Sequence, residues 1–203
     1  MNCAGCPAPC CQETVYLTPR EYEFLRKKQP TLQCTQVGEL HMMDACPFLK
    51  EGRCAIYKRR PLACIRFPLA VKPLDNAVVL LLHHTCPQVA YLPRTGQSLP
   101  PGELAKLGIT QEEYRTMLVA NLILEAEIGR VWKDFTLKER NKMRIIEAKQ
   151  KKAYAKPDVV VAVIPQEEYT NAVQSFADLL EEHPEMSYEE IIMHPVAELG
   201  DHT

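Results

Sequence analysis

Apolar residues recur at helical spacing along the second half of the chain. The side chains that carry this pattern are Tyr114, Met117, Leu118, Leu122, Leu124 and Ile128. Thr110 precedes them, with Glu113 three residues later, and this capping box is typical of a helix start. Thr136 and Glu139 form a second such box. The sequence therefore predicts one helix after Thr110 and another from about Thr136 to residue 154.

Further elements are predicted on both sides of these helices. The apolar run 159–164 indicates a strand, although a run this short also fits a buried helix. Two helices are predicted over 166–182 and 187–193. Near the N-terminus, Thr18 as N-cap and Pro19 at the first helical position predict a helix to residue 28. Residues 69–72 and 77–83 predict a hairpin closed by a turn at 73–76.

These elements predict an α+β fold that is mainly helical. Residues 1–95 would form an irregular, Cys-rich metal-cluster-binding domain with a small β-hairpin. Residues 103–203 would form a helical region of unknown role. Between them, residues 92–102 are rich in Pro, Gly and polar residues and are typical of a linker. The first part has little apolar surface, so we expect metal bonds to supply part of its stability.

Composition is that of an ordinary globular protein, with 46% hydrophobic residues and a net charge of −2. The longest apolar runs, 77–82 and 159–164, are too short to cross a bilayer. The start of the chain has neither the charged nor the apolar region of a signal peptide. We therefore expect a cytoplasmic protein that does not bind a membrane.

Charge is unevenly distributed along the chain. All 24 Lys and Arg residues precede residue 157, whereas the segment 157–203 carries eleven acidic residues. This segment either packs against the basic helix 138–152 of the same molecule or forms an acidic surface for a basic protein partner. The helical region is a second candidate surface for a protein partner. We do not expect helix 138–152 to bind nucleic acid, because its apolar positions indicate an amphipathic helix with a solvated face.

The nine cysteines all precede residue 87. Cytoplasmic thiols stay reduced, and an odd number cannot pair completely, so the pattern favours metal binding over disulfides. Eight of them form two groups of four, the first Cys3, Cys6, Cys10 and Cys11, the second Cys46, Cys54, Cys64 and Cys86. Each group could hold a tetrahedral zinc ion or an iron–sulfur centre. Cys10 and Cys11 could serve two metals from one point, or one of them is not a ligand.

The residues around these cysteines resemble a known family. The matching segments are Cys3-Ala-Gly-Cys6, Cys10-Cys11, Cys46-Pro47-Phe48-Leu49, Gly52-Arg53-Cys54-Ala55-Ile56-Tyr57, Arg60-Pro61, Cys64-Ile65-Arg66-Phe67-Pro68 and Cys86-Pro87. Together they resemble the YkgJ-type CxxCxxCC cysteine-cluster family, which is zinc- or iron-chelating and includes the flagellin lysine N-methylases. The resemblance implies that all eight grouped cysteines are metal ligands. Cys34 has no place in the pattern and is expected to be a buried small hydrophobe.

Basic residues near Cys64 are candidates for holding the cofactor. Arg60 and Arg66, together with Arg59, could stabilise a negatively charged cluster or grip an anionic substrate group. The plain alternative is pairing with a carboxylate such as Glu51 or Asp75.

Ligation by thiols alone suits zinc and iron–sulfur alike. The long, uneven gaps between the cysteines favour iron–sulfur. We expect one or two clusters of the 4Fe-4S type. This predicts a protein of electron transfer or of cluster-dependent group transfer, including methylation of a protein. The alternatives are a non-catalytic zinc module that binds a partner and, less favoured, a metal chaperone or store. No phosphate-binding loop, nucleophile elbow or zinc-protease motif is present, so nothing supports a hydrolase.

Overall fold

The computed structural model describes residues 11, 14–44, 46–83, 86–87, 89, 101–153 and 159–194. They form helices and three small sheets, so the mixed α and β content with helices predominating agrees with the sequence. In the described part of the chain, no helix combines the length and apolar character needed to cross a bilayer.

The helices begin where the capping residues predicted. Helix α1 (Pro19–Lys28) follows Thr18, α3 (Gln111–Lys133) follows Thr110, and α6 (Tyr188–Ile192) follows Ser187, each with a complete capping box. The remaining helices are α2 (Leu62–Arg66), α4 (Leu137–Ala153) and α5 (Gln166–Glu182), with 3-10 segments η2 (Tyr57–Arg59) and η3 (Pro101–Leu107). Before α4, Thr136 and Glu139 form the reciprocal hydrogen bonds of the predicted capping box.

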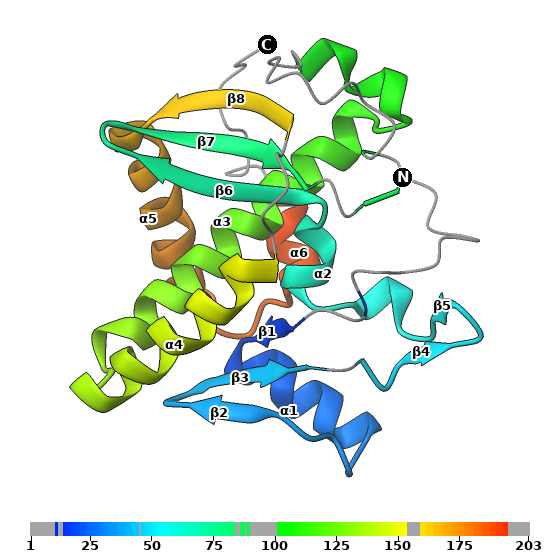
Figure 1. Cartoon of the computed structure of the whole chain (residues 1–203), viewed down its shortest axis with the longest axis vertical. Coiled ribbons are helices and arrows are strands. Elements are labelled where there is room, and N and C mark those ends of the chain that lie inside the picture. The colour runs from blue at the N-terminus through cyan, green and yellow to red at the C-terminus, as the bar shows by residue number, and fades with distance from the viewer. Residues whose placement is uncertain are drawn as a thin grey trace.

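The predicted hairpin and strand combine into one antiparallel sheet of order β6-β7-β8. Its strands are β6 (Leu69–Leu74), β7 (Ala77–Leu82) and β8 (Val159–Pro165). The turn is therefore tighter than predicted, at residues 75–76. Central strand β7 is buried at five consecutive positions, which explains its continuous apolar run. Figure 1 shows this sheet beside α5, with α3 running through the middle of the molecule.

The first part of the chain is more regular than its sequence suggested. Strands β1 (Val15–Leu17), β2 (Thr35–Val37) and β3 (Leu40–Met43) form a second sheet in the order β1-β3-β2, and β4 (Leu49–Lys50) pairs with β5 (Arg53–Cys54). The expectation of irregular structure outside one helix and one hairpin was wrong here. These strands have only two to four residues, which is too short for a period-two pattern to be recognised.

The largest hydrophobic core contains residues from both halves of the chain. Leu62, Leu80 and Leu82 pack there with Leu122 of α3 and Phe176 of α5. Of two smaller cores, one joins β2 and β3 to α3 and α4 around Met42 and Phe135, and the other lies in the first part of the chain around Leu17, Leu25 and Phe48. The division into domains at residues 95–103 stays a prediction, and the described core residues on its two sides pack together.

The turn between β2 and β3 provides a test of packing around Phe135. Gly38 has φ +56°, and a Cβ there would lie 2.6 Å from Phe135 Cε1. Gly38→Ala should therefore incur about 1–2 kcal/mol for the left-handed backbone and a further ~1–3 kcal/mol for displacing the buried ring. Urea unfolding would measure the loss.

Gly108→Ala is the matched control, because Gly108 has φ +66° and nothing within 4 Å of an added Cβ. Gly108→Ala should lose only the stability that the left-handed backbone conformation accounts for. Equal losses for the two variants would contradict the expected clash with Phe135.

Candidate functional site

Five of the eight predicted ligands lie among the described residues. Cys46 precedes β4, Cys54 lies on β5, Cys64 lies in α2, and Cys86 follows β7. Cys11 is the fifth, and Cys3, Cys6 and Cys10 lie outside the described residues.

Cys46 lies beside two of the other predicted ligands. Its backbone N–H donates to the Cys11 carbonyl at 3.4 Å, and the two thiols also interact. The β4–β5 hairpin brings Cys54 alongside: Cys54 pairs with Leu49, and the connecting residues 51 and 52 both have positive φ, as in a tight primed turn. Cys11 and Cys54, from two segments of the chain, thus both lie near Cys46.

The protein environment opposes ionisation of Cys46. Burial raises the pKa of its thiol and the nearby Cys54 adds to this, whereas the backbone amides of Phe48 and Leu49 and the thiol of Cys11 lower it. A bound metal cation would reverse this balance, because coordination deprotonates a thiol.

Cys64 and Cys34 pack against the same small core as Cys46, the one around Leu17, Leu25 and Phe48. Cys86 is only 6% exposed and belongs instead to the largest core. Cys34 is half-buried rather than fully buried as expected, and burial raises its thiol pKa.

Within the described ranges no group of three or more metal-ligating side chains is drawn together closely enough to hold an ion. The donors present do fit a thiol-rich site, since Cys11, Cys46 and Cys54 are the soft ligands that zinc and iron–sulfur centres use.

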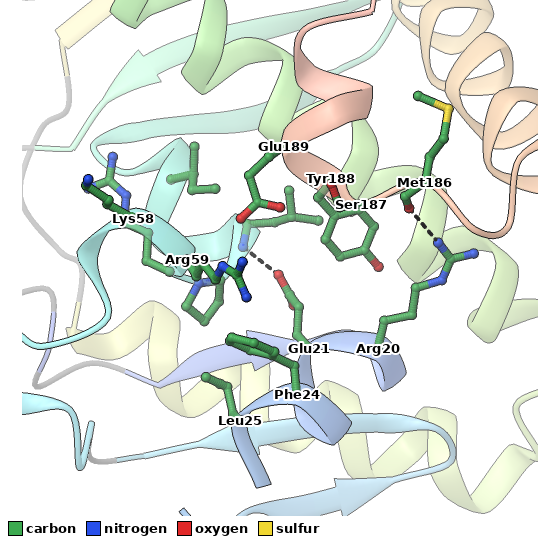
Figure 2. A pocket seen from close by; sticks show the side chains of 14 residues that line it. Arg20, Glu21, Phe24, Leu25, Lys58, Arg59, Met186, Ser187, Tyr188 and Glu189 are labelled. Atoms are coloured by element: carbon green, nitrogen blue, oxygen red, sulfur yellow. Dashed lines mark hydrogen bonds between the residues drawn. The ribbon is translucent and has the colours of Figure 1, made fainter. Parts of the chain in front are cut away.

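A cavity of about 460 Å³ lies next to Arg60, one of the two predicted cofactor-binding arginines. Three segments far apart in sequence line it: α1, the stretch from Lys58 to Ile65, and residues 186–189 at the start of α6. Arg60 lines it together with Arg59 and Arg20. Figure 2 shows Phe24 on one side of this cavity and Glu189 on the opposite side.

Arg66 lies elsewhere. Its Nη1 donates to Asn121 Oδ1 on α3 at 2.8 Å, and Asn121 Nδ2 donates to the Tyr169 hydroxyl at 2.7 Å. Burial raises the pKa of the nearby Glu125, and the Arg66 charge partly offsets this. Neither arginine, nor Arg59, forms an ion pair with Glu51 or Asp75 within the described ranges. The structure therefore separates Arg60, at the cavity, from Arg66, on the α3 side of α2.

A buried carboxyl group, Glu21, lies at the cavity and was missed from the sequence. It is 8% exposed, and its oxygens accept the backbone N–H groups of Thr18 at 2.8 Å and Leu62 at 2.6 Å. Burial raises the Glu21 pKa to about 7, although both backbone donors and the Thr18 hydroxyl lower it. The capping-box spacing of Thr18 and Glu21 was the available signal, but it does not reveal the contact with Leu62.

A second buried carboxyl group, Glu127 of α3, joins α6 to α1. The Tyr188 hydroxyl lies 2.7 Å from Glu127 Oε1 and 2.9 Å from Thr18 Oγ1. Arg130 Nη2 donates to Glu127 Oε2 at 3.0 Å, and Arg20 Nε lies 4.0 Å from Oε1. This network fixes the wall of the cavity that Tyr188 provides, and burial raises the Tyr188 pKa.

Comparison with known proteins supports the metal-binding prediction. Residues 2–87 match a protein-family model described as "CxxCxxCC: Putative zinc- or iron-chelating domain". No curated protein and no solved structure matches the chain. The resemblance to a CxxCxxCC domain, recognised from the cysteine pattern, is confirmed over residues 2–87. The matched segment includes all eight predicted ligands, as well as Arg60 and Arg66, whereas helices α3 to α6 lie outside it.

The raised pKa of Glu21 predicts how stability depends on pH. A carboxyl group with a folded pKa of about 7 and an ordinary value of 4.5 favours folding only while it is protonated. Its contribution to the free energy of unfolding therefore falls as pH rises from 4.5 to 7, by at most about 3 kcal/mol. Urea unfolding of wild type and Glu21→Gln across pH 4.5–8 would measure this.

Glu21→Gln should be the less stable protein at pH 4.5, because an amide cannot accept both backbone N–H groups, and the difference should shrink toward pH 7. Glu23→Gln on the exposed side of the same helix is the control and should differ from wild type by a nearly constant amount. If the difference in the free energy of unfolding between wild type and Glu21→Gln does not change with pH, the raised pKa of Glu21 is contradicted.

Proposed function

Because residues 2–87 match the CxxCxxCC family model, we propose that this part of the chain binds an iron–sulfur cluster through its eight grouped cysteines. The observation that carries the proposal is the approach of Cys11 and Cys54 to Cys46 within the matched segment. The ligands would be Cys3, Cys6, Cys10, Cys11, Cys46, Cys54, Cys64 and Cys86, enough for one or two 4Fe-4S clusters.

The donor set supports iron–sulfur chemistry without separating it from zinc. Thiolates bind both, and the family description names both metals. The uneven gaps between the ligands favour iron–sulfur. The reducing cytoplasm in which we place the protein favours metal binding over disulfides. The zinc alternative, a module that binds a partner without catalysis, has the same family description in its favour.

When bound, such a cluster supplies one-electron chemistry or activates a substrate. We propose electron transfer or group transfer, including methylation of a protein, as the role of the whole chain. The cavity that Arg60 lines supports a substrate-handling role, because it adjoins the helix that carries Cys64. We further propose that the acidic segment or the helical region contacts a protein partner.

Metal content is the first test of this proposal. Protein purified without oxygen should be brown, with a broad visible absorption band and equal amounts of iron and acid-labile sulfide. Iron, sulfide and zinc would be quantified on one sample. A colourless protein with stoichiometric zinc would overturn the iron–sulfur proposal and favour the zinc module.

A matched pair of cysteine variants tests the ligand assignment. Cys46 and Cys34 are both half-buried and pack against the same core, but only Cys46 belongs to the predicted ligand set. Cys46→Ser should lose at least about half of the bound metal, because one of two four-thiol groups loses a ligand. Cys34→Ser should keep the wild-type metal content. Equal metal content in the two variants, measured by elemental analysis, would remove Cys46 from the ligand set.

A further inference from the structure

The cavity between α1, α2 and α6 has an apolar interior. Leu25 and Leu62 are nearly or completely buried beside it, and Ile65 and Phe24 complete this surface. Its volume of about 460 Å³ lies in the range of pockets for small organic molecules. The rings of Phe24 and Tyr188 both line it, so a planar apolar body would meet aromatic surface.

The rim of the cavity carries a surplus of positive charge. Lys58, Arg59 and Arg60 follow one another in sequence and all line the cavity. The Arg59 guanidinium lies 5.7 Å from the Phe24 ring centre, and that of Arg60 lies 4.4 Å from the ring centre of Tyr57. Across the described ranges, no carboxylate forms an ion pair with any of these three cations. Their charge therefore remains available to an anion.

The other charged groups at the cavity do not cancel this surplus. Arg20 is engaged with the Met186 carbonyl at 3.4 Å and lies near Glu127. Both oxygens of Glu21 accept backbone N–H groups, and its burial favours the neutral form. Glu189 is exposed and lies across the cavity from Phe24. One exposed carboxylate thus faces three cations without ion-pair partners.

We propose that this cavity binds a small organic anion with a planar aromatic body, an aromatic carboxylate or phosphate ester. Its anionic group contacts Arg59 and Arg60, since guanidinium groups bind such oxygens through paired N–H donors. Its ring lies against Phe24 and Tyr188. The binding site is formed by side chains alone and does not depend on which metal the cysteines bind.

Binding of 2-naphthoate to the full-length, metal-loaded protein tests the proposal by calorimetry. The neutral isostere 2-naphthamide and inorganic phosphate are the comparison ligands. 2-Naphthoate should bind at least about 10-fold more tightly than either, because only it has both the charge and the aromatic body. Equal binding of 2-naphthamide, or no binding of 2-naphthoate, would overturn the proposal.

Variants locate the site. Arg59→Gln, at an exposed position, should raise the dissociation constant for 2-naphthoate about 10-fold, since one charge-assisted contact is lost. Phe24→Leu should also weaken the binding of 2-naphthoate, because it removes the contact with the Phe24 ring. Arg144→Gln, on the exposed side of α4 and outside the cavity, should leave the dissociation constant for 2-naphthoate unchanged. Equal effects of Arg59→Gln and Arg144→Gln would place the ligand elsewhere. Metal content measured on the same samples separates failure of this proposal from failure of the metal proposal.

Discussion

The carboxyl group of Glu21 determines how the first helix meets the helix that carries Cys64. Helix α2 has only five residues, and Pro61 at its N-cap position has no side-chain oxygen to bind the first N–H groups. Unpaired N–H groups at a helix start are costly when buried. Glu21 Oε1 accepts the Leu62 N–H, while Oε2 accepts that of Thr18. The Glu21 side chain therefore completes the capping box of α1 and also caps α2, although it is distant from α2 in sequence. The energetic cost is the burial of an ionisable group.

The cavity exists because the C-terminal part of the chain returns to this junction. The Tyr188 hydroxyl reaches both Thr18 and Glu127, so α6 is held against α1 and α3 together. These contacts join residues separated by 170 and 61 positions in sequence. The cationic stretch 58–60 is part of the domain matched by the family model, whereas the wall containing Tyr188 lies outside it. Neither part of the chain would form this cavity alone.

The sequence predicted elements whose signals are local. Capping boxes at Thr110 and Thr136 predicted where two helices begin, and apolar runs predicted β7 and β8. Sequence could not show that β8 pairs with β7, because nothing local encodes contact between strands some 80 residues apart. The two-residue strands beside Cys54 depend on a turn rather than on periodicity. Burial of Glu21 requires the distant Leu62 N–H, so the capping box alone could not reveal it.

The predicted ligands are held by different kinds of structure. Cys64 lies in a helix fixed at its start by Glu21 and at its end by Arg66, which bonds Asn121 of α3. Its position is therefore set by the protein before metal binds, as an effective ligand site requires. Cys54 instead lies on a two-residue ladder whose strands bury little apolar surface, and Cys46 precedes the first of these strands. So short a hairpin is marginal in water by itself. Metal bonds would therefore contribute most to stability at this hairpin and least at α2.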